Sequence, residues 1–325
     1  MKLPRRRFLQ LAAGAATLPA AGRVARAQAY PARPVHLISP FAAGGPNDIT
    51  ARLIGQWLSE RLGQQFVIDN RTGAGANIGT EVVVRAPPDG YTLLLVSSAN
   101  AVNATLYDKL SFDFIRDIAP VASIIGVPNV MIVNPSVPAK TVPEFIAYAK
   151  ANPGKVNMAT SGNGSTTHIS GELFKELTGV NLVAVAYRGG GPALIDMLGG
   201  QMQVMFEPTL ACIEYIKAGT LRALAVTTAA RSELLPDVPT VGEFVPGYEA
   251  SQWYGIGAPR GTPPEVVAEL NKQINAALAD PKMKARLADL GGIPTPMTPA
   301  EFGKFIANET EKWGKVVRAG NIKAD

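Results

Sequence analysis

The stretch that decides the fold lies near the start of the chain and reads VHLISPFAAGGPND over residues 35–48. Residues 35–39 are mostly Val, Leu and Ile, a composition typical of a buried strand. A glycine-rich loop follows at residues 40–47, and a helix is expected from residue 48 to about residue 62. A strand that leads through such a loop into a helix is the opening unit of a parallel sheet covered by helices.

The same alternation of short apolar runs and helical segments continues along the chain, which predicts an α/β fold. Strands are expected at residues 35–39, 66–68, 91–96, 130–133, 156–160, 182–186, 203–206, 221–226 and 253–258. Helices are expected at residues 48–62, 75–85, 141–151, 167–177, 192–198, 210–218, 263–279, 281–290 and 299–319. A Thr or Asp just before a proline predicts the start of each of the last three helices.

Those last helices cannot form a domain with the single strand that precedes them. We therefore expect them to return to the first part of the chain, which gives two α/β lobes with a hinge and a ligand cleft between them. Lobe 1 is predicted to hold residues 28–127 plus 253–325, and lobe 2 residues 128–252. Two chain crossings between lobes allow the lobes to open and close as rigid bodies.

Residues 1–27 are predicted to be an export signal. The sequence PRRRFLQ at residues 4–10 has the twin-arginine form, and an uncharged stretch rich in Ala and Leu follows it. This stretch is shorter than the roughly 20 residues that span a bilayer, which argues against a transmembrane anchor. Ala25-Arg26-Ala27 has the small-x-small pattern of a cleavage site, so we expect cleavage after Ala27 and a mature protein in the periplasm.

Charge and composition exclude several classes of function. The full chain has 31 Lys and Arg against 26 Asp and Glu, but six of the basic residues lie in residues 1–27, so the mature chain has a net charge of −1. No basic patch is left for nucleic acid or anionic lipid. One cysteine, Cys212, and two histidines, His36 and His168, make no disulfide or zinc motif. We expect no cofactor, no metal and a monomer.

Three glycine-rich loops follow predicted strands and lead into helices, at residues 41–48, 161–168 and 187–193. In an open parallel sheet, ligands bind beyond the carboxyl ends of the strands. Glycines there expose backbone N–H groups and helix N-termini add partial positive charge, so the expected guest is an anion. Because the loops offer Ser, Thr and Asn side chains and a single basic residue, Arg188, a carboxylate fits better than a phosphate.

Individual side chains can be placed around this guest. Glu207 is expected either to accept a hydrogen bond from a ligand amine or hydroxyl or to cap the next helix, and His168 to donate a hydrogen bond or cap its own helix. Apolar walls could come from Phe41, Tyr187, Phe206, Trp253 and Tyr254, although Phe206 and Trp253 fit the core equally well. The predicted ligand-binding residues are Phe41, Ala43, Gly44, Gly45, Asn47, Asp48, Ser98, Asn103, Ser161, Gly162, Gly164, Ser165, Thr166, Thr167, His168, Tyr187, Gly189, Ala193, Phe206 and Glu207.

Catalytic and nucleotide-binding motifs fit the sequence less well. GAGANIG at residues 73–79 is GxGxxxG and not the dinucleotide pattern GxGxxG, and neither a Walker A nor a GxSxG sequence occurs. Ser165, His168 and Asp196 leave a periplasmic serine hydrolase as an alternative, which no spacing supports. We do not expect an enzyme.

Several motifs occur in a fixed order: PFAAGGPND at residues 40–48, NRTGAGANIG at 70–79, PDGYTL at 88–93, SGNGS at 161–165 with His168, YRGGGPA at 187–193 and WYG at 253–255. Together they resemble the Bug family of solute receptors, the extracytoplasmic component of tripartite tricarboxylate transporters, over essentially the whole mature chain. The resemblance implies a type II periplasmic-binding-protein fold. It also implies that a carboxylate is held between residues 43–48 and 161–168, often through ordered waters.

Family members bind di- or tricarboxylates, acidic amino acids or aromatic acids, and the resemblance implies delivery to the membrane subunits of the transporter. Three positions depart from the family pattern. Asn47 stands where Thr or Ser is usual, Ala186 where Pro is common, and Glu207 where Asp is common. These departures leave the substrate open. A receptor that feeds a sensor kinase is an alternative that the sequence does not distinguish.

Overall fold

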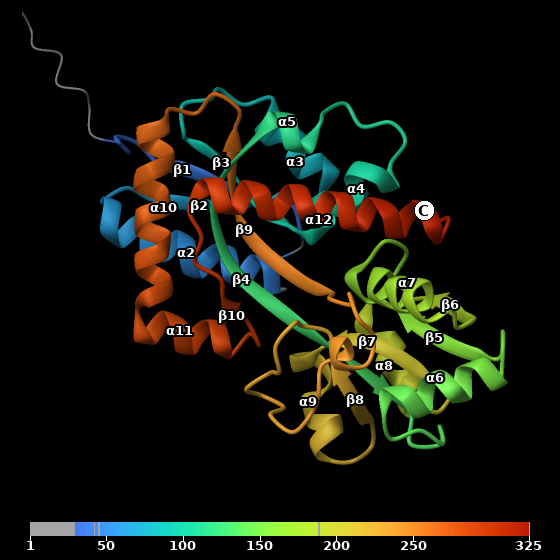
Figure 1. Ribbon diagram of the computed structural model, residues 1–325. Helices are drawn as coiled ribbons and strands as arrows, with labels where there is room; N and C mark the ends of the chain where they lie inside the picture. Colours follow the sequence, from blue (N-terminus) through green and yellow to red (C-terminus); the bar gives the residue numbers. More distant parts are fainter. Residues whose placement is uncertain (1–29, 42, 45, 188, 325) are drawn as a thin grey trace, which may run out of the picture.

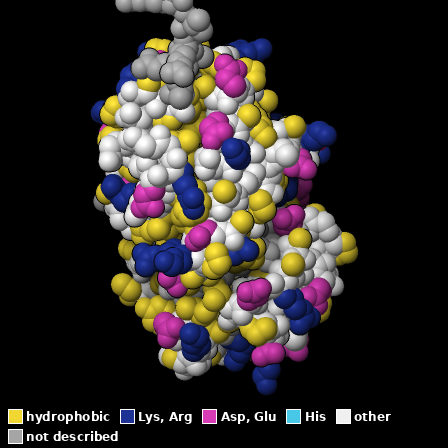
Figure 2. All heavy atoms as spheres, turned by 90° about the vertical axis from the view of Figure 1, so that its left-hand side faces the viewer, with side chains coloured by type: hydrophobic (Ala, Val, Ile, Leu, Met, Phe, Trp, Pro, Cys, Tyr) yellow, Lys and Arg dark blue, Asp and Glu magenta, His cyan; other side chains and the backbone are white. Residues whose placement is uncertain are grey.

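The protein is described by a computed structural model, which covers residues 30–324 except 42, 45 and 188. The predicted export signal and its cleavage site therefore lie outside the described residues. Within these ranges, no helix combines the length and the apolar character that a membrane span requires. On the face of the molecule in Figure 2, basic and acidic side chains are interspersed.

The elements alternate between strand and helix along most of the chain. The strands are β1 Val35–Ser39, β2 Phe66–Asn70, β3 Thr92–Ser97, β4 Ile118–Val133, β5 Val156–Thr160, β6 Leu182–Ala186, β7 Val204–Pro208, β8 Arg222–Val226, β9 Ser251–Pro259 and β10 Ile293–Pro294. The α-helices are α2 Pro46–Leu62, α3 Asn77–Val84, α4 Ser98–Leu106, α5 Phe114–Asp117, α6 Val142–Ala151, α7 Thr166–Thr178, α8 Gly190–Leu198, α9 Thr209–Lys217, α10 Pro264–Ala279, α11 Pro281–Ala288 and α12 Pro299–Ala319. Short 3-10 turns are η1 Ala74–Ala76 and η2 Val241–Glu243.

Two groups of strands form the two α/β lobes of the molecule (Figure 1). In lobe 1 the strand order is β2-β1-β3-β9-β4, with β1, β2 and β3 parallel. In lobe 2 the order is β4-β7-β5-β6, with β5, β6 and β7 parallel. The terminal helices return to lobe 1 as expected, since α10 packs on β4 and α2, and α12 packs on α4 and β4.

The long strand β4 belongs to both lobes. Its residues from Ile118 to Pro128 pair with β9, and those from Asn129 to Val133 pair with β7. The sequence predicted a strand only at residues 130–133, which was wrong for the first part of β4. Proline interrupts a ladder because it has no N–H, but the pairing with β9 shifts register just after Pro120 and so accommodates it.

Helix boundaries differ from the prediction at several points. Helices α4 and α5 were not predicted; α4 begins with an Asn instead of a Glu in its capping box, where Asn100 Oδ1 accepts from Ser97 N at 2.9 Å. Helices α2 and α8 each begin two residues earlier than expected. Thr262 does not cap α10, because its hydroxyl donates to Pro259 O, whereas Asp280 and Thr298 cap α11 and α12 as predicted.

Candidate functional site

A cavity of about 620 Å³ lies between the two lobes. It opens at the carboxyl ends of the parallel strands, where the chain leaves β1 and β3 in lobe 1 and β5 and β7 in lobe 2. The lining residues are Phe41, Asn47, Ser98, Ala99, Val102, Val127, Ser161, Gly164, Ser165, Thr166, Thr167, Gly190, Gly191, Glu207, Pro208, Leu210, Ala211, Gln252, Tyr254 and Leu290.

Five helices begin at this cavity. The first turns of α2, α4, α7, α8 and α9 all contribute lining residues. Each helix follows a strand, so in each lobe the helix starts gather at the carboxyl edge of the sheet. The first N–H groups of a helix have no partner within the helix and carry partial positive charge. Five such starts around one space make an environment suited to an anion.

Buried polar atoms at the cavity wall also lack partners within the described protein. Asn47 Nδ2, Ser98 Oγ and Tyr254 OH have no hydrogen-bond partner, and all three side chains are buried. An unsatisfied buried polar group costs about 1–3 kcal/mol, so a guest in the cavity gains by pairing with them. All three atoms can donate a hydrogen bond, and all three come from lobe 1.

Glu207 is the one acidic side chain among the described lining residues. It lies at the end of β7, is 4 % exposed, and its Oε2 has no partner. Burial raises the pKa of its carboxyl from 4.5 to about 7. The expected role as a helix cap was wrong, because α9 has Pro208 at its N-cap and no side-chain cap.

A glycine lies opposite this carboxyl. A Cβ atom added to Gly190 would lie 2.5 Å from Glu207 Oε1. Gly190 is also the first residue of α8, so the glycine lets the start of the helix approach the carboxyl closely. Glu207 and the start of α8 are therefore immediate neighbours in the wall of the cavity.

The loop that precedes α7 is held by its own side chains. Ser165 caps the helix by accepting from His168 N at 3.3 Å, and its hydroxyl donates to Gly162 O at 2.6 Å. Thr167 Oγ1 accepts from Ser161 N at 2.7 Å. These contacts hold the loop at the cavity wall and turn the first N–H groups of α7 toward the space.

His168 does not face Ser165 with its ring. Its Nδ1 accepts from Gly164 N at 3.1 Å, and its Nε2 lies 3.6 Å from Glu172 Oε1. Asp196, the third residue of the hydrolase alternative, accepts from Tyr187 OH at 2.6 Å. Among the hydrogen bonds of the described residues, none joins the Ser165 hydroxyl to the imidazole, which a serine nucleophile would need.

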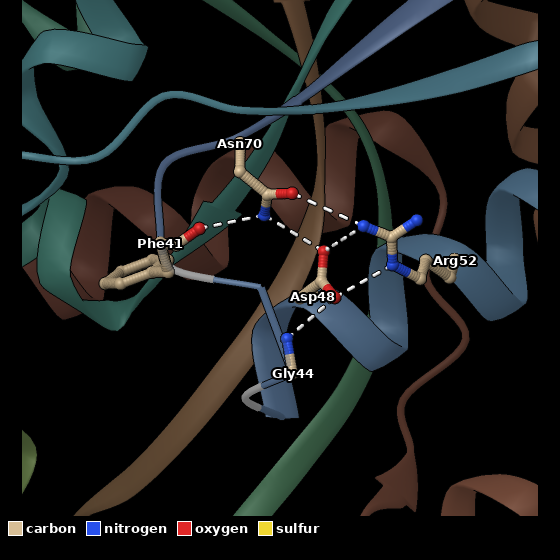
Figure 3. A network of polar contacts seen from close by, with 5 residues as sticks. All are labelled: Phe41, Gly44, Asp48, Arg52 and Asn70. Carbon is tan, nitrogen blue, oxygen red and sulfur yellow. Dashed lines mark hydrogen bonds and ion pairs between the residues drawn. The ribbon is translucent and has the colours of Figure 1, made fainter.

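The loop that precedes α2 is held by a network around Asp48 (Figure 3). The Asp48 carboxylate accepts from Gly44 N at 2.9 Å, from Asn70 Nδ2 at 2.9 Å, and from Arg52 at 2.8 and 3.0 Å. Asn70 also donates to Phe41 O at 2.9 Å. Burial alone would raise the pKa of Asp48, but the hydrogen bonds from Arg52, Gly44 and Asn70 outweigh it and lower the pKa to about 2.

Asp48→Asn is expected to destabilise the protein by about 1–2 kcal/mol at neutral pH, because charge-assisted bonds are lost but Arg52 is half exposed and screened. A carboxyl with a lowered pKa stabilises the fold above its ordinary pKa and loses that contribution as the pH falls toward about 2. Denaturant unfolding should therefore show a smaller difference between the two proteins near pH 3 than near pH 7. Asp108→Asn, at an exposed position, is the control. A difference that does not change with pH would contradict this role.

The structure brings part of the predicted binding set together at the cavity. The predicted residues that line it are Phe41, Asn47, Ser98, Ser161, Gly164, Ser165, Thr166, Thr167 and Glu207. Ala43 and Gly44 are exposed in the loop before α2, and Gly45 lies outside the described residues. Asn103 donates to Gly75 O, and the Asp48 carboxylate holds the loop before α2. Both side chains therefore stabilise segments next to the cavity and do not line it.

The remaining predicted residues lie beside the cavity or in the core. Gly162, Tyr187 and Gly189 belong to the loops before α7 and α8 and His168 to the first turn of α7, and His168 and Tyr187 bond within lobe 2. Ala193 and Phe206 are fully buried in apolar clusters. Trp253 is also buried, and its Nε1 donates to Glu309 Oε2 at 2.9 Å, whereas Tyr254 lines the cavity.

The predicted binding set did not include the starts of α8 and α9 or any residue of β9 or beyond α11, although residues 187–193 were named as a ligand loop and Tyr254 as a possible apolar wall. The lining residues that this set left out are Ala99, Val102, Val127, Gly190, Gly191, Pro208, Leu210, Ala211, Gln252, Tyr254 and Leu290. The Gly-Gly-Gly-Pro run at residues 189–192 was a usable signal that a helix begins here, although its proline places the start at residue 192 and not at residue 190. Val127, Gln252 and Leu290 carry no local signal, because their place depends on how β4, β9 and α11 pack.

Known proteins resemble this chain over almost its full length. Residues 50–322 match the family described as "Tripartite tricarboxylate transporter family receptor". Protein BugT of Bordetella pertussis is 39% identical over 300 residues, which cover 91% of this chain and 92% of that protein.

Solved structures agree with this match. The Rhodopseudomonas palustris protein MatC with bound malate has 33% identity and a TM-score of 0.74, covering 89% of this chain and 100% of that one. R. palustris Rpa4515 with adipate has 39% identity and a TM-score of 0.78, covering 90% of this chain and 99% of that one. The family resemblance and the two-lobed fold are confirmed, and the chain belongs to the tripartite tricarboxylate transporter receptor family.

Proposed function

We propose that this receptor captures a small carboxylate in the periplasm and delivers it to the membrane subunits of a tripartite tricarboxylate transporter. The observation that carries the proposal is the convergence of five helix N-termini on one cavity. Asn47, Ser98 and Tyr254 add three unpartnered donors to the same wall. That two relatives were solved with adipate and malate supports the same ligand chemistry.

The available donors suffice for a physiological affinity. A hydrogen bond to a charged group contributes about 1.5–3 kcal/mol. Four or five such bonds, reduced by the cost of ordering, reach the roughly 8 kcal/mol of a micromolar complex. Neutral donors and backbone N–H groups therefore hold a carboxylate without an arginine or lysine in contact with it.

Closure of the lobes would complete the site. Lining residues come from both lobes, so a bound ligand makes contacts that neither lobe supplies alone. We propose residues 28–127 plus 253–325 and residues 128–252 as the two rigid bodies. The change of partner along β4 between Pro128 and Asn129, and the start of β9 at Ser251, support these boundaries.

Export completes the proposal. A twin-arginine signal at residues 1–27, cleaved after Ala27, would place the mature chain in the periplasm. There the receptor can meet solutes before they reach the membrane subunits. The sequence pattern of residues 4–10 and 25–27 supports this route.

Thermal denaturation of purified residues 28–325 tests the ligand class. Monocarboxylates, dicarboxylates, amino acids and aromatic acids are added singly, with sulfate and phosphate as anions of another shape. A ligand at 100 times its Kd stabilises the folded state by about 2.7 kcal/mol, so a rise in Tm of about 5 °C or more is expected with one class of carboxylate. A protein stabilised by phosphate or sulfate but by no carboxylate would contradict the proposal. Mass spectrometry of what the denatured protein releases identifies any ligand that co-purifies.

A further inference from the structure

The unpartnered side-chain atoms of the cavity wall differ between the two lobes. The unpartnered donors Asn47, Ser98 and Tyr254 belong to lobe 1, and the unpartnered carboxyl of Glu207 belongs to lobe 2. A carboxylate of the ligand is satisfied by the donors. The Glu207 carboxyl in the opposite wall accepts hydrogen bonds. A ligand that satisfies both walls therefore has a carboxylate at one end and a hydrogen-bond donor at the other.

No basic side chain stands beside this carboxyl in the described part of the wall. None of the described lining residues is Lys, Arg or His. Gly190, Val130 and Cys212 are neighbours of Glu207, and burial together with the charge of Glu207 raises the pKa of the Cys212 thiol. None of these neighbours supplies a positive charge. The carboxyl is therefore left to pair with whatever the cavity holds.

We infer that Glu207 selects ligands that carry a hydrogen-bond donor, above all an ammonium group, at the end remote from the bound carboxylate. The inference rests on the proposed function, since it assumes that one ligand carboxylate is held by the helix N-termini together with the donors of lobe 1. An ammonium or hydroxyl group at that end satisfies the buried carboxyl of Glu207. A second ligand carboxylate there would face a like charge, or would require Glu207 to hold a proton.

The raised pKa of Glu207, about 7, agrees with this arrangement. A buried carboxyl without a partner binds its proton more tightly, and a cation beside it reverses the effect. Glu207 is thus a specificity-determining residue. It sets which carboxylates the receptor accepts, while the helix N-termini supply the general attraction for the first carboxylate.

The test uses length-matched ligands that differ only at the far end. Isothermal titration of residues 28–325 compares 4-aminobutyrate, 4-hydroxybutyrate, butyrate and glutarate, and then 5-aminopentanoate, pentanoate and adipate. A charge-assisted hydrogen bond is worth about 1.5–3 kcal/mol, so the amino acid should bind at least about tenfold more tightly than the dicarboxylate of the same length. The hydroxy acid should lie between the two.

Glu207→Gln should abolish this preference, because it removes the charge and keeps the shape. Affinity for the amino acids should fall by at least about tenfold, and affinity for the plain monocarboxylates should change by less than about threefold. Glu214→Gln makes the same change at an exposed position on α9, 78 % exposed, and should leave every affinity unchanged.

The outcomes separate this inference from the proposed function. Dicarboxylates that bind the wild-type protein as tightly as the matched amino acids would overturn the inference and leave the carboxylate receptor standing. A preference for amino acids that survives in Glu207→Gln would also overturn it. If none of the carboxylates in the panel bound the wild-type protein, both the proposed function and this inference would be contradicted.

Discussion

Ser165→Asp is expected to weaken carboxylate binding by at least about 100-fold while the fold is retained. Ser165 lines the cavity and caps α7 by accepting from His168 N. Aspartate is as good an N-cap as serine, so this hydrogen bond is kept, and of the serine contacts only the bond donated to Gly162 O is lost. The new negative charge, however, stands at the cavity where five helices begin, which is where we propose that the carboxylate binds. Two like charges about 5 Å apart at an effective dielectric constant near 20 repel by about 3 kcal/mol.

Two controls isolate the effect of the charge. Ser165→Asn keeps a capping oxygen without the charge and should reduce affinity by less than about tenfold. Thr141→Asp puts the same charge at the N-cap of α6, which does not contribute to the described lining, and should leave binding unchanged. Titration calorimetry with the tightest carboxylate of the panel measures all three. Wild-type affinity in Ser165→Asp would mean that the carboxylate docks elsewhere.

Glu207→Gln is expected to make the unliganded protein more stable near pH 8, by about 3 kcal/mol. The pKa of Glu207 rises from 4.5 to about 7 on folding because the carboxyl is buried. Below its unfolded pKa the group is protonated in both states and costs nothing. Between pH 4.5 and about 7 the unfolded state gives up the proton while the folded state keeps it, so the wild-type protein loses stability over this range, and the loss is complete above about pH 7. Glutamine stays neutral throughout.

Denaturant unfolding near pH 5, pH 6.5 and pH 8 measures this difference, without ligand and with Glu214→Gln as the control. The advantage of Glu207→Gln should be small near pH 5 and largest near pH 8. An advantage that is the same at every pH would show that the Glu207 carboxyl is not a buried acid of raised pKa. If the expected result is found, the receptor keeps a carboxyl that weakens its fold, as binding sites commonly do.

Much of the fold could be predicted because its signals are local. The strands β1, β5 and β6 and the helix α12 were predicted at their observed bounds from apolar runs and capping residues alone. The first part of β4 was missed, since Pro120, Gly126 and Pro128 are residues that normally end a strand. There the register shifts against β9, which a single sequence does not reveal.

The candidate site, too, could be predicted from the sequence only in part. Glycine-rich loops at strand ends indicated where an anion would bind, and these loops do meet at the cavity. Which side chains face the ligand was less predictable. Asp48 and Ser165 both lie at the starts of helices that border the cavity. The Asp48 carboxylate, however, accepts hydrogen bonds from Gly44, Arg52 and Asn70. A polar group that is already hydrogen-bonded within the protein is not free to bind a ligand. Only the structure shows which groups are bonded in this way.

The sequence by itself determined the fold class and the family, and it led to the prediction of an anionic ligand. Hydrophobic periodicity, glycine-rich loops and helix starts are each encoded by residues that are close in the sequence. They can therefore be recognised without knowledge of contacts between distant segments. The tertiary structure alone decided that the start of α9 joins the same cavity, that Tyr254 lines it while Phe206 and Trp253 belong to the core, and that Glu207 Oε2 is left without a partner among the described residues. These facts depend on which distant segments pack together and on which polar atoms that packing leaves unsatisfied.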